Sequence, residues 1–79
     1  MVNSPYSKII EGANLVNAYQ QYIQQLKDEN RYLRQEMMIL PAYSPEWNSN
    51  QREIRANMEE IRIMEQLIAT DITELEKAL

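Results

Sequence analysis

Residues 22–37 read YIQQLKDENRYLRQEM, and this stretch decides the fold. Apolar side chains and one Asn recur in it at alternating steps of three and four residues. The same spacing continues in both directions along the chain. The full row is Ile9, Gly12, Val16, Tyr19, Ile23, Leu26, Asn30, Leu33, Met37 and Leu40. A heptad repeat with apolar residues at its a and d positions is typical of a helix in a coiled coil.

The composition of this row favours pairing with a second copy of the chain. If Ile9 is position a, β-branched residues fill most of the a column and Leu most of the d column, which favours two parallel strands. Asn30 is the one Asn in the a column. In a parallel dimer, the two copies of such an Asn side chain form a hydrogen bond with each other across the dimer axis. The predicted dimer interface is Val16, Tyr19, Ile23, Leu26, Asn30, Leu33 and Met37. An antiparallel pair of chains uses the same row and stays open as an alternative.

In this spacing the stretch 22–37 resembles a leucine zipper, over about a fifth of the chain. In zipper transcription factors a basic arm precedes the zipper and lies in the major groove of DNA. Here residues 1–21 contain Lys8 as their single basic residue. The resemblance therefore implies dimer geometry, and direct nucleic-acid binding is not expected.

Helix signals divide the chain at its prolines. Ser4 before Pro5 forms a helix start, and the residue before Pro41 is disfavoured in the α region. Ser44-Pro45 is a second start signal, in competition with caps at Asn48-Ser49-Asn50. The prediction is a single domain over residues 1–79, with helix one at about 5–40, a loop at about 41–49 and helix two at about 50–78.

Each helix carries a further apolar line, and together these lines predict the architecture. Beside the heptad row, helix one has a line at the c and g positions: Leu15, Ala18, Tyr22, Gln25, Glu29, Tyr32, Glu36 and Ile39. Helix two has an amphipathic stripe at Ile54, Met58, Ile61, Met64, Ile68, Ile72, Leu75 and Leu79. We expect the c and g line to pack on helix two and the heptad row on a twin. The fold class is then all-α, an antiparallel helical hairpin that dimerises into a four-helix bundle.

The composition limits the chemistry. A chain of 79 residues is marginally stable alone, and without Cys or His it has neither disulfides nor thiolate and imidazole metal ligands. Nucleophile systems that need His or Cys are excluded, and a single Gly rules out a Gly-rich phosphate loop. We therefore expect no catalytic residues, no metal, no cofactor and no enzymatic activity.

The sequence also predicts where the protein works. The first residues lack the charged and apolar segments of a secretory signal, and the longest apolar run, residues 37–40, is far shorter than a membrane span. A cytoplasmic protein without membrane contact is expected. The net charge is −4, and residues 46–79 carry eight acids against four bases.

Two sets of residues are candidates for binding a partner. Tyr43 and Trp47 place aromatic side chains at the corner, where Trp47 can also plug the end of the hairpin. Ile63 lies outside the stripe of helix two and forms a patch with Leu67 and neighbouring acids. That patch suits a basic or amphipathic partner.

The function we expect is that of a small homodimeric coiled-coil adaptor or regulatory protein that binds and modulates a target protein. Its size and simplicity are those of accessory proteins of phages and mobile elements. Alternatives are a scaffold or assembly chaperone, and an acidic DNA mimic or other regulator linked to nucleic acid. Its partners would be a second copy of itself and an unidentified protein.

Overall fold

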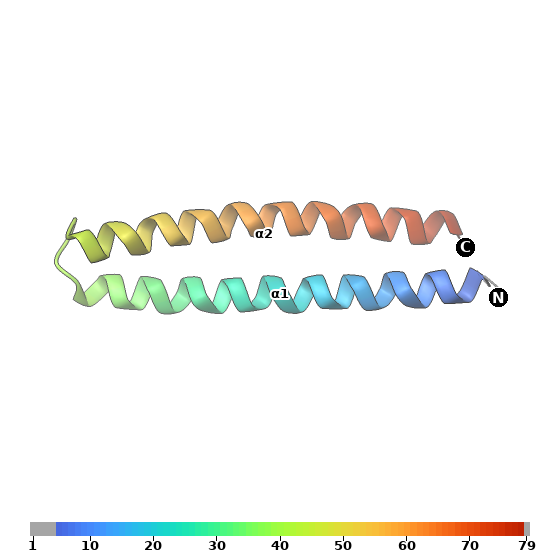
Figure 1. Ribbon diagram of the computed structural model, residues 1–79, viewed down its shortest axis with the longest axis horizontal. Helices are drawn as coiled ribbons and strands as arrows, with labels where there is room; N and C mark the ends of the chain where they lie inside the picture. Colours follow the sequence, from blue (N-terminus) through green and yellow to red (C-terminus); the bar gives the residue numbers. More distant parts are fainter. Residues whose placement is uncertain (1–4, 79) are drawn as a thin grey trace.

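The computed structural model describes the backbone of residues 5–78 and the side chains of residues 13–74, 76 and 77. Two helices, α1 (Pro5–Ile39) and α2 (Pro45–Ala78), run antiparallel beside each other in a rod of 59 × 17 × 15 Å (Figure 1). The prediction of an all-helical hairpin is confirmed. The Ser4 cap expected for α1 lies outside the described residues.

The corner is shorter than expected because Ser44 caps α2. The Oγ of Ser44 accepts a hydrogen bond from the backbone N–H of Trp47 at 3.2 Å, and the carbonyl of Ser44 accepts one from the backbone N–H of Asn48 at 2.9 Å. A side-chain acceptor three residues before a free N–H is the usual way to begin a helix. The helix therefore starts at Pro45, about five residues before the predicted start, and the competing caps at residues 48–50 lie inside it.

The backbone reverses over residues 40–44. The N–H of Ser44 donates to the carbonyl of Pro41 at 3.1 Å, and Tyr43 takes a positive φ of 63°. This left-handed conformation is uncommon for a residue with a Cβ. The Nδ2 of Asn48 donates to the Tyr43 carbonyl at 3.1 Å and so holds the turn in place.

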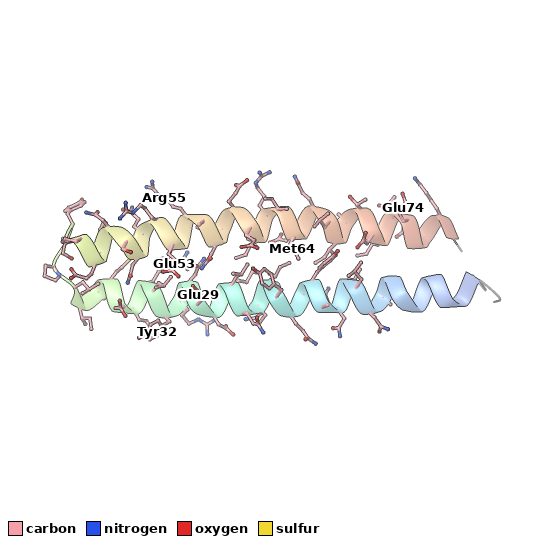
Figure 2. All side chains as sticks on the ribbon, viewed as in Figure 1. Glu29, Tyr32, Glu53, Arg55, Met64 and Glu74 are labelled. Atoms are coloured by element: carbon pink, nitrogen blue, oxygen red, sulfur yellow. The ribbon has the colours of Figure 1, made fainter. Side chains whose placement is uncertain are left out.

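The heptad row of α1 faces α2 within the same chain. The buried apolar side chains are Ile23, Leu26, Leu33, Ile54 and Ile61. Met64 and Ile68 pack against the cluster formed by Ile23, Leu26 and Ile61, and Figure 2 shows Met64 reaching from α2 toward α1. The two helices thus pack along a seam that has the heptad spacing of a coiled coil.

The stripe predicted for α2 is only partly right. Ile54, Ile61, Met64 and Ile68 do face α1, whereas 53% of Met58 and 42% of Ile72 are exposed. The inward row has the same three-and-four spacing as that of α1. Its members are Trp47, Asn50, Ile54, Asn57, Ile61, Met64, Ile68 and Asp71, all buried or half-buried. Because three of them are polar, a search for apolar residues alone selects the neighbouring positions instead.

The prediction that the c and g line of α1 packs on α2 is wrong. Leu15, Tyr22, Tyr32 and Ile39 are all exposed. They lie beside the heptad row, and a two-helix coiled coil covers only one stripe of each helix. The result is a thin core, with no described side chain buried beyond 98%. Over the residues described, neither helix has an apolar stretch that could cross a bilayer.

Candidate interaction surfaces

The residues predicted as a dimer interface lie in the seam between α1 and α2. Four of them are buried and three are half-buried. The buried ones are Ile23, Leu26, Asn30 and Leu33, and the half-buried ones are Val16, Tyr19 and Met37. In the single chain described, this row is therefore covered by α2, and its contact with a second copy stays a prediction.

Two buried polar contacts fix how the helices align. Asn30 and Asn57 are 3% and 9% exposed, and the Nδ2 of Asn57 donates to the Oδ1 of Asn30 at 2.9 Å. Nearer the corner, the Nδ2 of Asn50 donates to the Oε1 of Glu36 at 3.0 Å and to the Leu33 carbonyl at 3.4 Å. Buried amides are costly unless they are bonded. A shift of one helix along the other would break these bonds, so they specify the register.

The two aromatic candidates at the corner have different environments. Trp47 is half-buried at the first seam position of α2, and Tyr43 is exposed. Their ring centroids lie 4.9 Å apart at an interplanar angle of 53°. Trp47 therefore closes the corner end of the seam, and Tyr43 presents an aromatic ring to solvent beside it.

Ile63 and Leu67, the other candidates, lie one turn apart on α2 and are 45% and 42% exposed. One turn before Ile63 is Glu60, whose Oε1 accepts a hydrogen bond from the hydroxyl of Tyr22 on α1 at 2.8 Å. This bond places the patch on the side of the hairpin where the exposed c and g line of α1 also lies. It also raises the pKa of Tyr22, with smaller contributions from burial and from the charges of Glu60 and Glu29.

This side of the hairpin is acidic. Its carboxylates lie beside the seam in steps of seven residues, at Glu29 and Glu36 on α1 and at Glu46, Glu53 and Glu60 on α2, and Glu74 follows two steps after Glu60, with Leu67 between them. We call the surface that carries them, together with Tyr22, Ile63 and Leu67, the acidic face. Figure 2 shows Glu29 and Glu53 lying near each other on the two helices. The one described base on this face is Lys77, whose Nζ lies 3.7 Å from Glu74.

The contact of Glu29 with Glu53 makes stability depend on pH. The pKa of Glu53 is raised above 4.5, first because the two carboxyls share a hydrogen bond, then by burial and by the charges of Glu29 and Glu36. A carboxyl with a raised pKa binds its proton more tightly in the folded state, so stability rises as pH falls from neutral toward about 4.5. We expect Glu53→Gln to raise the melting temperature at pH 7, by a margin that shrinks toward pH 4.5.

Thermal melts followed by circular dichroism across this pH range measure that effect. Glu76→Gln, which changes an exposed carboxyl away from the seam, is the control and should leave the profile of the wild type unchanged. If both variants follow the same profile, the carboxyls of Glu29 and Glu53 do not interact in solution.

The opposite side of the hairpin has two adjoining grooves beside the seam, each with a mixed polar and apolar lining, and together we call them the groove. The first is lined by Gln20, Ile23, Gln24, Lys27, Glu65, Ile68, Ala69 and Ile72, and the second by Lys27, Asn30, Arg34, Met58 and Ile61. The basic residues on this side are Lys27, Arg31, Arg34, Arg55 and Arg62. We call this surface the basic face. Its acids are Glu65 and Glu76, and Arg62 is paired with Glu59 of its own helix.

The separation of charge between the two faces was missed in the sequence analysis, which found only that the second half of the chain is acidic. The signal is present in the sequence. Sorting the charges of both helices by heptad position reveals it, but only once the inward row of α2 is known. That row contains Asn50, Asn57 and Asp71, so it is not the most apolar row of the helix.

Among the described residues, no group of three or more carboxylates is arranged to hold a metal ion. No protein-family model matches the chain, and the searches of curated proteins and of solved structures also found no match.

Proposed function

We propose that this chain is a small adaptor or regulatory protein that acts by binding other proteins through the outer surfaces of its helical hairpin. Its copies pair into a four-helix bundle, and the exposed faces of the bundle receive a target. The observation that carries this proposal is the number of large apolar side chains left outside the seam. Among the residues whose side chains are described, ten are exposed: Leu15, Tyr22, Tyr32, Met38, Ile39, Tyr43, Met58, Ile63, Leu67 and Ile72.

The extent of the exposed surface supports the same function. The chain has an accessible area of 6212 Å², whereas a compact protein of 9.4 kDa has about 5000 Å². Single exposed apolar residues are ordinary, but residues grouped on one helix face are typical of interaction sites. Ile63 and Leu67 form such a group on α2, as do Tyr32 and Ile39 on α1.

Site-specific photocrosslinking in the source cells tests the proposal. A photoreactive phenylalanine replaces Ile63 or Leu67 in separate variants, and the same residue replaces Gln66 as a control. Gln66 is exposed on the outer side of α2, opposite the seam, and is turned by about 60° from Ile63 and by about 100° from Leu67 around the helix axis.

We expect discrete cross-linked products from Ile63 and Leu67, and none of comparable yield from Gln66. A product whose mass is a whole multiple of the chain mass would identify self-association, and any other mass would identify a target. Equal yields from all three positions would contradict the proposed function.

A further inference from the structure

The two faces of the hairpin leave opposite charges without partners, and one further inference follows, which rests on the proposed function. On the acidic face, no salt bridge between described residues reaches Glu29, Glu36 or Glu53. Glu29 and Glu53 instead lie near each other (Figure 2), and this proximity of two carboxyls raises the pKa of Glu53. This face therefore lacks positive charge along most of the seam.

The basic face shows the complementary pattern. No salt bridge between described residues reaches Lys27, Arg34 or Arg55. Lys27 and Arg34 border the groove, which exposes Met58 and Ile72. A groove of this kind accepts the apolar side of another helix, and its basic border favours a helix with acidic flanks.

The charges decide which arrangement of two copies is favourable. A symmetric pair joined through the acidic face brings six described glutamates per chain against six, with one described lysine on each side. A symmetric pair joined through the basic face opposes five bases on each side, with two acids. Both arrangements place like charges together, which is unfavourable across an interface.

We infer that copies of the chain associate with the acidic face of one hairpin on the basic face of the next. The glutamates of the first copy then lie against the Lys and Arg residues of the second. The apolar side chains of Ile63 and Leu67 cover the groove that exposes Met58 and Ile72. The four-helix bundle of the proposed function is the two-copy unit of this arrangement.

This arrangement has a consequence for size. Each contact uses two different surfaces, so a pair still has one free acidic face and one free basic face. Such heterologous contacts add further copies unless the rotation between neighbours closes a ring. The average mass should therefore rise above that of a dimer with concentration at low salt. Higher salt should reduce it, because screening weakens exposed charge pairs.

Two charge-reversal variants test the inference. E29K/E53K weakens the acidic face, and R34E/R55E weakens the basic face. We expect each variant alone to associate at least tenfold more weakly than the wild type in sedimentation equilibrium. An equimolar mixture should regain association, because the intact basic face of the first variant meets the intact acidic face of the second.

The control is the triple variant Q21K/D28K/Q66K. It changes the total charge by the same amount as E29K/E53K, but its substitutions lie on the outer positions of the helices. It should associate like the wild type. Helical circular dichroism confirms that each variant is folded before it is compared.

A wild type that is monomeric at low salt at every concentration would overturn the inference, as would folded variants that do not associate when mixed. Photocrosslinking to a protein of another mass would then still support the proposed function, so the two failures are distinguishable. An association that rises on mixing and falls with salt supports the acidic-on-basic contact.

Discussion

The Leu26→Ala variant is expected to lose about 2–5 kcal/mol of folding free energy, the usual effect of removing a buried Leu side chain. Leu26 is 6% exposed and belongs to the cluster with Ile23 and Ile61. Because the seam is the only core between the described parts of the two helices, no second layer compensates for the cavity. Domains of this size have little stability to spare, so most of the population should unfold under mild conditions.

Leu67→Ala is the matched control for this effect. It removes the same atoms from α2 at a position that is 42% exposed, and an exposed substitution usually changes stability by less than about 0.5 kcal/mol. Urea unfolding followed by circular dichroism, at one fixed protein concentration, compares the two variants. If both lose the same free energy, the buried seam of the hairpin is not the core of the protein.

The second large effect is expected at the Asn pair. Replacing either Asn30 or Asn57 with Leu leaves the other buried amide without its partner, at a cost of about 1–3 kcal/mol. The double variant N30L/N57L removes both amides together. We expect it to be at least as stable as either single variant and close to the wild type, because two apolar side chains then face each other across the seam.

A double-mutant cycle measures the coupling between Asn30 and Asn57, by comparing the free energy lost by the double variant with the sum of the losses in the two single variants. If the double variant is destabilised by the sum of the two single effects, the side chains do not bond in solution. The double variant should also lose specificity, since a buried Asn pair favours one register and one number of strands. Sedimentation of the double variant should then detect a mixture of different assemblies, whereas the wild type should form a single series of oligomers.

The sequence predicts the helices well because their boundaries depend on local chemistry. Pro5 and Pro41 place α1, and Ser44 before Pro45 provides the start of α2. The predicted start near residue 50 came from the competing caps at residues 48–50. The backbone N–H of Trp47 donates a hydrogen bond to the Oγ of Ser44, so Ser44 caps the helix and α2 begins at Pro45.

The partner of the heptad row could not be predicted from its own residues. Its apolar side chains can be covered by a twin or by α2, since both offer a complementary seam. The deciding residues are Asn50 and Asn57, which bond across the seam but lower the apparent hydrophobicity of the row that contains them. The predictions of a dimer, of a target protein and of a cytoplasmic location remain predictions.

The candidate surfaces were predicted in part. The patch of Ile63 and Leu67 with neighbouring acids stands out from the sequence because both residues fall off the stripe of α2. The basic face does not stand out, because Lys27 and Arg34 are far in sequence from Arg55. Only the antiparallel packing of the two helices brings them to one side.

The central claim is that the heptad row of α1 is covered by α2 of the same chain, and a disulfide measures this most directly. Under oxidation, N30C/N57C should form a bond within one chain, detected as the mass of one chain that migrates faster on a non-reducing gel. N30C alone should remain uncrosslinked. Rapid crosslinking of N30C alone into a dimer, with no bond within one chain in N30C/N57C, would contradict the account.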